Sequence, residues 1–461
     1  MVERPMDLPL RVAVVGAGPA GFYATEALLK QREDVRVDVI DRLPAPFGLV
    51  RYGVAPDHQK IKSVTRVFER LLDDPRVRFV GGVEVGRELS AEDLARHYHA
   101  TVLAYGAAGD RRLGIPGEDL RGSLSATDFV GWYNGHPDLT DLEPPLDRQW
   151  AYVVGVGNVA VDVARLLAKT PAELASSDIA RHAAVALAGS QVTDIVVLGR
   201  RGPAEAKWTT KELREFGELE DTDVVVDPTE LDVLLASRAA IADDTAALRN
   251  LDVLEGFASK PLAGKRRRVY LRFLRSPRAI EPDASGTRVG AIVLERNRLV
   301  ERPNGVIGAD GTGVSERLPA SLVLRSVGYR GRGLPGFPFD ERKAIVPNDL
   351  GRVIGPDGAT LPGVYVAGWI KRGPSGVIGT NKPDAVETAQ SLLADPVRAI
   401  DPDDARPEAI DALLHGRGVT VLDRDGWRRI DEAETTAGAA EGRPRVKLVT
   451  VKELLDAARS T

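Results

Sequence analysis

The chain has 461 residues, of which 43% are hydrophobic and 28% charged, and its formal net charge is −5. This length predicts two or three domains of an ordinary globular protein, and the acidic balance argues against a dedicated nucleic-acid binder. Because the sequence has no cysteine, it excludes disulfides, a cysteine nucleophile and cysteine-ligated zinc or iron–sulfur sites, and we predict no metal site. No apolar run is long enough to span a membrane and no apolar leader precedes the first strand, so we expect a cytoplasmic protein.

A strand–turn–helix–strand pattern opens the chain. An apolar strand at 10–15 leads into the turn Gly16-Ala17-Gly18-Pro19-Ala20-Gly21, followed by a helix at 22–31 and a second strand at 35–41. In a G-x-G-x-x-G turn the first glycine permits the tight turn, the second lets the backbone approach a pyrophosphate, and the third lets helix and strand pack closely. Asp41 ends the second strand, where an acid accepts hydrogen bonds from an adenosine ribose. The pattern predicts a dinucleotide with an unphosphorylated ribose, as in FAD or NAD.

The next stretch alternates loop, helix and strand. A loop rich in proline and glycine covers 42–60, a helix is expected at 61–74, and strands are expected within 77–86 and 100–110. Gly109-Asp110, followed by Pro116-Gly117-Glu118, marks the expected crossing into a second domain.

The same device recurs about 140 residues later, as expected for two nucleotide-binding domains. A strand and helix at 151–169 flank Gly155-Val156-Gly157-Asn158-Val159-Ala160, with alanine in place of the third glycine. An insertion at 170–193, which we expect to be helical, separates this unit from the strand that ends in Arg200 and Arg201. An acid would repel a 2′-phosphate, whereas a guanidinium binds it bidentately. The two arginines therefore predict NADP, the alternative being a solvated surface pair.

Three further segments lie towards the C-terminus. Residues 266–277 have the pattern of a basic edge strand, with Arg268, Tyr270 and Arg272 on one face. At 363–393 a strand ends at Trp369, and a glycine-rich turn precedes a helix that starts near Thr380–Asn381. Backbone N–H groups at such a helix start can face the pyrimidine end of a flavin, and Trp369 is placed to stack on the flavin ring unless it is a plain core tryptophan. The tail beyond Pro396 mixes short helix and strand patterns and has no recognisable chemistry.

Several motifs occur together in a fixed order: "GAGPAGFYA", "PFGLVRYGVAPDHQKIK", "GWYNGHPD", "VVGVGNVAVDVARLL", "GRRGPAEAKWTTKELREF", "RSVGYRG" and "VAGWIKRGPSGVIGTNKPDA". Between about residue 10 and about residue 395, the chain resembles the adrenodoxin reductase-type ferredoxin–NADP reductases. The resemblance implies an α/β fold of two Rossmann-like dinucleotide-binding domains, in which an NADP domain (109–329) is inserted into a FAD domain (1–108 and 330–461). It also implies hydride transfer from NADPH to FAD and single-electron transfer to a ferredoxin-type iron–sulfur protein.

The same resemblance assigns site residues. It implies FAD contacts at matching positions, namely Ala20, Asp41, Leu49, the backbone near Glu84, Trp369, Gly376, Val377 and Ile378. It implies NADP contacts at Arg111, Gly157, Asn158, Val159, Ala160, Arg200, Arg201 and Glu212, with Gly376 near the nicotinamide. His58 and Glu215 match the polar pair beside the flavin. Hydride transfer needs no side-chain acid or base, so we expect this pair to position the nicotinamide, with handling of a proton at the reduced flavin as a further role.

Two other functions stay open at this point: an oxidase or monooxygenase that uses FAD and NADPH on a small molecule, and a nucleotide sensor that has lost turnover. A disulfide reductase is excluded because it needs a cysteine pair. Ferredoxins are generally acidic, so docking needs a local basic surface. Its candidates are Lys265 to Arg268, Arg272 and Arg275, although a solvated edge strand protected by charge explains them equally well.

Overall fold

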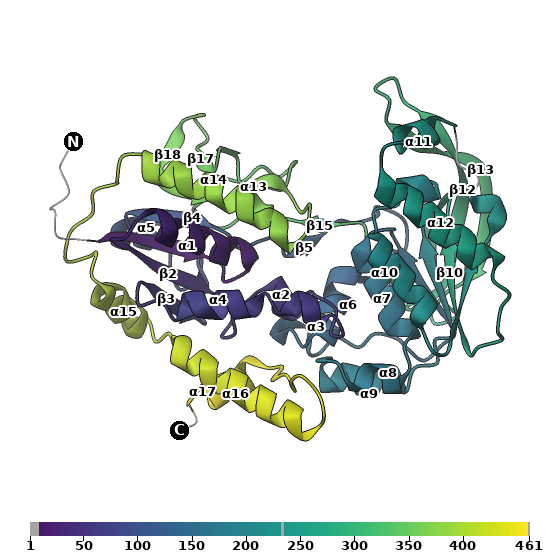
Figure 1. Ribbon diagram of the computed structural model, residues 1–461, viewed down its shortest axis with the longest axis horizontal. Helices are drawn as coiled ribbons and strands as arrows, with labels where there is room; N and C mark the ends of the chain where they lie inside the picture. Colours follow the sequence, from purple (N-terminus) through teal and green to yellow (C-terminus); the bar gives the residue numbers. More distant parts are fainter. Residues whose placement is uncertain (1–8, 232–234, 460–461) are drawn as a thin grey trace. The chain divides into compact units, whose positions relative to one another are not determined.

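The computed structural model describes residues 9–231 and 235–459. The chain forms two compact units, the first from Met1–Gly109 with Gly328–Thr461 and the second from Asp110–Val327. The chain leaves the first unit at β5 (Gly109–Asp110) and re-enters it before β15 (Tyr329–Arg330). The predicted fold class is confirmed: both units are α/β with a parallel sheet, and one is inserted into the other (Figure 1).

The sheet of the first unit contains seven strands. In spatial order they are β16 (Asn348–Asp349), β17 (Arg352–Ile354), β18 (Thr360–Val366), β4 (Ala100–Leu103), β1 (Leu10–Val15), β2 (Val35–Asp41) and β3 (Val77–Gly81). From β18 to β3 the strands are parallel, and β16 and β17 continue the sheet in antiparallel fashion. Every residue of β1 is buried, which explains its almost unbroken apolar sequence, because a central parallel strand is covered on both faces.

Helices cover both faces of this sheet. Val12 and Val14 point to one face, which is covered by α1 (Pro19–Gln31), α4 (Thr65–Leu72), α14 (Asn381–Ala394), α16 (Arg424–Ala440) and α17 (Val451–Arg459). Ala13 and Val15 point to the other face, where α5 (Ala91–His97) and α15 (Pro407–Gly416) pack. Helix α14 runs beside α1 (Figure 1). The short helices α2 (Leu49–Tyr52), α3 (Gln59–Lys62) and α13 (Trp369–Arg372) complete the unit.

Two predictions for this unit need correction. The helix expected at 61–74 is split into α3 and α4, because the Ser63 hydroxyl donates to the Lys60 carbonyl and ends the first piece. The strand patterns expected in the tail are also wrong, since the described part of the tail folds as α15, α16 and α17, with one isolated bridge between Leu422 and Gly81. Around residue 448 the backbone N–H groups bond to carboxylates instead of a neighbouring strand; Leu448, for example, donates to Glu434 at 2.8 Å.

The sheet of the second unit contains six strands. In spatial order they are β6 (Ser123–Ser125), β14 (Leu322–Arg325), β7 (Trp150–Val154), β8 (Asp194–Leu198), β10 (Arg267–Arg272) and β9 (Thr222–Val226). A separate antiparallel sheet contains β11 (Arg275–Pro282), β12 (Val289–Glu301) and β13 (Ile307–Pro319). The helices are α6 (Ala126–Tyr133), α7 (Asn158–Ala168), α8 (Pro171–Ala175), α9 (Arg181–Ala188), α10 (Thr210–Glu215), α11 (Leu235–Ala240) and α12 (Thr245–Ser259). The helical insertion is confirmed, because α8 and α9 occupy it.

The prediction of a basic edge strand was wrong. Strand β10 lies between β8 and β9 and pairs in parallel with both. Val269 and Leu271 are fully buried, and Arg267 is buried as well, donating its Nε–H to the Val192 carbonyl at 3.3 Å. The prediction failed because the charged residues of this strand are typical of an edge strand, although it lies inside the sheet. Among the residues that the structure describes, no helix has the length and apolarity to cross a membrane.

Candidate functional site

The glycine turn of the first unit is open where a phosphate would lie. Gly16 has a φ of 113°, and a Cβ there would lie 2.6 Å from the Ala104 carbonyl oxygen. A Cβ at Gly21 would lie 2.0 Å from the Gly16 oxygen, whereas one at Gly18 would meet no atom within 4 Å. Gly18 immediately precedes the 13-residue helix α1, whose start has no side-chain cap. The first N–H groups of α1 are therefore available to an anion, and this turn fits a pyrophosphate.

Asp41 ties the end of β2 to this turn. Its Oδ2 accepts the Ala17 N–H at 2.7 Å and its Oδ1 accepts the Leu43 N–H at 2.9 Å. Burial raises the pKa of Asp41, although both backbone hydrogen bonds oppose that shift. The predicted ribose contact stays a prediction, and a ribose would share a carboxylate that the backbone already uses.

A second segment approaches the same turn. Phe47 donates its N–H to the Ala17 carbonyl at 2.7 Å, and a Cβ on Gly48 would lie 3.1 Å from the Gly18 Cα. Leu49 follows as the first residue of α2 and is 36% exposed. We did not predict the approach of Gly48 to Gly18 from the sequence, and the only signal for it was a glycine within the Pro-Phe-Gly-Leu loop. Glu84 lies farther along the chain, where its backbone N–H donates to its neighbour Glu88 at 2.8 Å.

Trp369 begins α13 and is partly exposed. Its Nε1–H donates to the Ser375 carbonyl at 3.1 Å, and the Tyr329 ring lies 5.0 Å from its ring, centroid to centroid. Just before it, the Gly368 N–H donates to the Asp384 carboxylate at 2.5 Å. This acid in the first turn of α14 was missed from the sequence. The Asp384 carboxylate thereby fixes the residue that follows β18 relative to the start of α14.

Gly376, Val377 and Ile378 lie in the turn that precedes α14. Ile378 starts the 3₁₀ turn Ile378–Thr380, and α14 begins directly afterwards at Asn381. Val377 is 60% exposed. These residues therefore lie at a helix start, although their contact with a flavin is untested.

The glycine turn of the second unit has the same geometry. Gly155 has a φ of 140°, and a Cβ there would lie 2.1 Å from the Ser326 carbonyl oxygen, whereas one at Gly157 would meet no atom within 4 Å. Gly157 immediately precedes α7, whose start has no side-chain cap. Asn158 accepts the Thr209 N–H on its Oδ1 at 2.8 Å. Ala160, in place of the third glycine, is fully buried. This turn also fits a pyrophosphate.

Arg200 and Arg201 follow β8, the neighbour of β7 in the sheet. Arg200 is exposed, and Arg201 is partly exposed with its Nη1 donating to the Ile307 carbonyl at 3.4 Å. Their own carbonyls accept hydrogen bonds from Asn297 at 2.7 Å and Leu274 at 3.1 Å. Within the described part of the chain, no carboxylate forms an ion pair with either guanidinium. The backbone is fixed and both charges are available to a ligand.

The remaining residues assigned to NADP lie on ordered segments of the second unit. Glu212 is in the first turn of α10, where the Thr209 hydroxyl donates to its carboxylate at 2.8 Å. Arg111 is exposed and precedes a loop that the buried Glu118 holds by accepting the Leu113 N–H at 2.7 Å and the Gly114 N–H at 2.8 Å. Glu118 is therefore a structural residue of the crossing segment.

The two residues of the predicted polar pair belong to different units. His58 immediately precedes α3 in the first unit. Glu215 ends α10 in the second unit, and its carboxylate lies 3.2 Å from the Nε of the buried Arg165. Their pairing stays a prediction.

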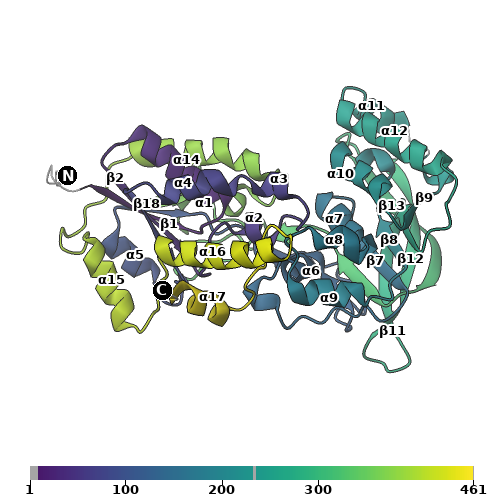
Figure 2. The ribbon, with the colours of Figure 1, turned by 60° about the horizontal axis from the view of Figure 1, so that its bottom comes forward.

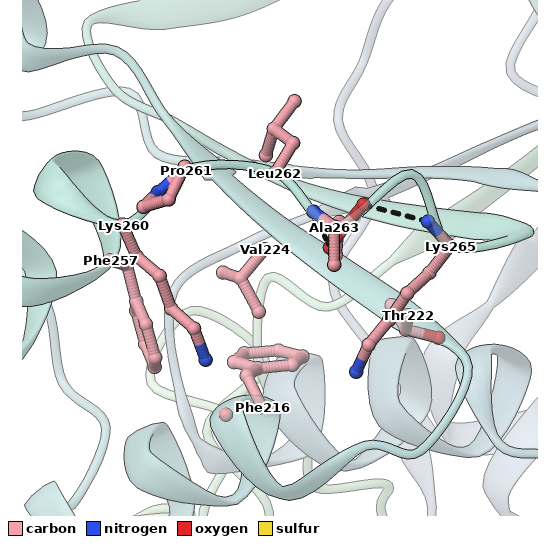
Figure 3. A pocket seen from close by; sticks show the side chains of 11 residues that line it. Phe216, Thr222, Val224, Phe257, Lys260, Pro261, Leu262, Ala263 and Lys265 are labelled. Carbon is pink, nitrogen blue, oxygen red and sulfur yellow. Dashed lines mark hydrogen bonds between the residues drawn. The ribbon is translucent and has the colours of Figure 1, made fainter.

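A pocket in the second unit lies at the end of the sheet where the strand β9 begins, and it is not a nucleotide site. Phe216, Phe257 and Lys260 line it beside Thr222, the first residue of β9 (Figure 3). Ligands of open α/β sheets bind at the carboxyl ends of the strands, whereas this pocket lies where β9 begins. Asp223, another lining residue, accepts backbone N–H groups of the loop 263–265, so its carboxylate serves to shape the loop.

Most cations of the basic segment already have partners. Arg272 and Arg275 lie 2.9 and 3.1 Å from the Glu230 carboxylate, and Arg268 lies 3.5 Å from that of Asp194. Lys265 donates to the Leu219 carbonyl at 2.8 Å. These contacts favour a structural role for the segment over docking.

Comparison with known proteins decides the family. Residues 10–196 match the family described as pyridine nucleotide-disulphide oxidoreductase. The chain is 46% identical to the NADPH-ferredoxin reductase FprA of Mycobacterium tuberculosis over 460 residues, covering 97% of this chain and 98% of the relative. It is 42% identical to the mitochondrial NADPH:adrenodoxin oxidoreductase of Salvelinus fontinalis, covering 98% and 91%. The solved structure of M. tuberculosis FprA in complex with NADPH superposes with a TM-score of 0.93 at 44% identity, covering 98% of this chain and all of the other.

The chain belongs to the adrenodoxin reductase-type ferredoxin–NADP reductases. It is therefore an oxidoreductase, and the resemblance inferred from the motifs is confirmed. The match covers almost the whole chain, so the tail beyond Pro396 also belongs to the reductase.

Proposed function

We propose that this reductase is a FAD-containing NADPH:ferredoxin oxidoreductase whose first unit holds FAD and whose second unit holds NADP. NADPH gives a hydride, and each of two oxidised ferredoxins receives one electron, with NADP⁺ and a proton as the other products. Bound FAD supplies the chemistry that links these steps, because a flavin accepts two electrons together and can release them singly. The observation that carries the proposal is the contrast between two open glycine turns, one beside Asp41 and the other beside Arg200 and Arg201.

In the first unit, backbone groups hold the dinucleotide. The N–H groups at the start of α1 would hold the pyrophosphate of FAD, with Gly48 and Leu49 as further residues of the same site. Asp41 receives the ribose. Trp369 and the turn at Gly376, Val377 and Ile378 would orient the flavin ring system, and the start of α14 would favour negative charge there.

In the second unit, the turn at Gly157, Asn158, Val159 and Ala160 binds the pyrophosphate of NADPH. Arg200 and Arg201 bind its 2′-phosphate through charge-assisted hydrogen bonds, which NADH cannot make because it lacks that phosphate. Arg111 and Glu212 complete the site. This arrangement makes the enzyme selective for NADPH over NADH.

His58 and Glu215 position the nicotinamide for hydride transfer. Neither side chain has to accept or donate the transferred hydride, so their contribution is orientation and, at most, the handling of a proton. Arg165 keeps Glu215 in place within its own unit, with an Nε–O distance of 3.2 Å.

The name of the matched family includes disulfide oxidoreduction, which this chain cannot perform because it has no cysteine. The relatives are named for ferredoxin and adrenodoxin, and we propose an iron–sulfur protein of that class as the electron acceptor. We propose the cytoplasm as the location, as expected from a sequence with no apolar leader before the first strand.

The test is NADPH-dependent cytochrome c reduction by the purified yellow protein, measured with and without added ferredoxin, after the released flavin has been identified as FAD. We expect ferredoxin to accelerate the reaction strongly. A protein that binds no flavin would contradict the proposal. A flavoprotein indifferent to ferredoxin but stimulated by an organic substrate would support the oxidase or monooxygenase alternative.

A further inference from the structure

The segment at 47–52 has a backbone that needs external support. Phe47 has a φ of 83° although it is not glycine, and Gly48 follows with a φ of 47°. Such a conformation is strained at a bulky residue and persists only where the surroundings hold it. This segment lies against the first glycine turn through the Phe47–Ala17 hydrogen bond. Its shape therefore helps to define the proposed pyrophosphate site.

The support comes from the C-terminal tail. Arg51 is buried, and N–H groups on its two terminal nitrogens donate to the two oxygens of the Glu434 carboxylate of α16, with N–O distances of 2.8 and 2.5 Å. Glu434 is fully buried and also accepts the Leu448 N–H at 2.8 Å. Lys447 donates its Nζ to the Arg51 carbonyl at 3.2 Å. Figure 2 shows α16 running beside α2 within the first unit.

Aromatic packing connects the same elements. The Trp427 ring of α16 meets the Phe47 ring edge-on, with 5.4 Å between centroids and an angle of 89°. The Arg51 guanidinium lies 5.6 Å from the centroid of the Trp427 ring. The tail thus holds the segment at both Phe47 and Arg51.

A second buried ion pair that contacts the tail lies away from the segment 47–52. The first unit contains another buried pair, Arg11 with Asp38 at 2.7 Å, in which Arg11 also donates to the Ala405 carbonyl of the tail at 3.0 Å. Arg11 lies near the start of β1, whereas the glycine turn follows the end of that strand. The Arg11 pair therefore supplies a matched comparison: a buried ion pair with a tail contact, but without contact to the segment 47–52.

We propose that α16 and the segment that follows it are a positioning element for FAD: the Arg51–Glu434 pair and Trp427 hold residues 47–52 against the phosphate-binding turn. Arg51 and Glu434 are positioning residues, because they act through Gly48 and Leu49 and not by touching the cofactor. The inference rests on the proposed function, since it requires that the first unit binds FAD.

The experiment measures the dissociation constant of FAD from the full-length apoprotein by quenching of flavin fluorescence. The variants are Arg51→Met, Glu434→Gln and the conservative Arg51→Lys, with Arg11→Met as the matched control, and Tm is measured for each apoprotein. Glu434→Gln leaves the buried Arg51 without the carboxylate that it pairs with, whereas Arg51→Met leaves Glu434 with its other partner Arg445, at 3.0 Å. We expect Arg51→Met and Glu434→Gln to weaken FAD binding about tenfold or more, Arg51→Lys to recover part of the loss, and Arg11→Met to lower Tm while changing FAD binding less than about twofold.

Each outcome has one meaning. If Arg51→Met and Glu434→Gln bind FAD as tightly as the unmodified chain, or if Arg11→Met weakens binding as much at an equal loss of Tm, the positioning role is wrong. If Arg51→Met does not fold, Glu434→Gln and Arg51→Lys decide by the same criterion. If the unmodified protein itself binds no FAD, the proposed function fails instead.

Discussion

Replacing Arg200 and Arg201 together by alanine tests the proposed selectivity for NADPH. Both guanidiniums are without an ion-pair partner in the described part of the chain, so their removal exposes no unpaired carboxylate there. The carbonyls of these two residues remain bonded to Asn297 and Leu274. The double variant is therefore expected to keep its loop and its stability.

The expected size follows from the exposure of the two side chains. A hydrogen bond to a charged group contributes about 1.5–3 kcal/mol, and solvent screening at exposed positions brings this towards about 1–1.5 kcal/mol for each arginine. Together they give about 2–3 kcal/mol, which corresponds to a loss of about 30- to 150-fold in kcat/KM for NADPH. NADH lacks the 2′-phosphate, so its kcat/KM should change less than about threefold.

The assay is steady-state ferricyanide reduction with each nucleotide, which needs no ferredoxin. Arg266→Ala is the control, because Arg266 is an exposed cation that precedes β10 and so lies at the opposite edge of the same parallel sheet. That variant should leave both nucleotides unaffected. Equal losses for NADPH and NADH in the double variant would refute the role of the arginines.

Three further predictions follow from the geometry. Gly157→Ala should keep its Tm but raise KM for NADPH, since its Cβ meets only open space. Gly155→Ala should lower Tm, because its Cβ would lie 2.1 Å from the Ser326 oxygen. Thermal unfolding and NADPH kinetics distinguish the two variants, and equal behaviour of both would contradict the prediction. Arg272→Gln should lower Tm and reduce ferricyanide and ferredoxin turnover alike, because Arg272 pairs with Glu230; a loss confined to ferredoxin would restore the docking hypothesis. Burial raises the pKa of Glu434, but Arg51, Arg445 and the Leu448 N–H together outweigh burial and hold the pKa below its ordinary 4.5. The stabilisation by these contacts is therefore present above that pH and is lost as the pH falls through the lower folded-state value. The Tm advantage of the unmodified protein over Glu434→Gln should therefore shrink in acid, and a constant difference would contradict this.

The sequence predicted the parts of the fold that depend on local pattern. Both glycine turns and their strands follow from residues adjacent in the chain, and the structure confirms them, although α1 begins at Pro19 within the turn and not at residue 22 as predicted. The position of β10 was wrong because Arg268 and Arg272 resemble the charges of an edge strand, while their partners Asp194 and Glu230 are distant in sequence. Local pattern does not show which remote acid pairs with a given cation.

The same limit applies to the site. Asp41 was recognised by its place at the end of a strand, but its two backbone hydrogen bonds depend on how the loop folds back. The contact between Arg51 and Glu434 joins residues 383 positions apart, and a lone arginine in a loop gives no sign of it. Only the folded chain brings the C-terminal tail to the proposed cofactor site.

The most direct test of the central proposal is an anaerobic titration of the purified flavoprotein with NADPH, followed by oxidised ferredoxin. We predict that NADPH bleaches the flavin absorbance, that an equal concentration of NADH does so much less effectively, and that two ferredoxins are reduced for each NADPH consumed. A flavin that NADPH leaves oxidised, or a reduced flavin that ferredoxin cannot reoxidise, would contradict the assignment.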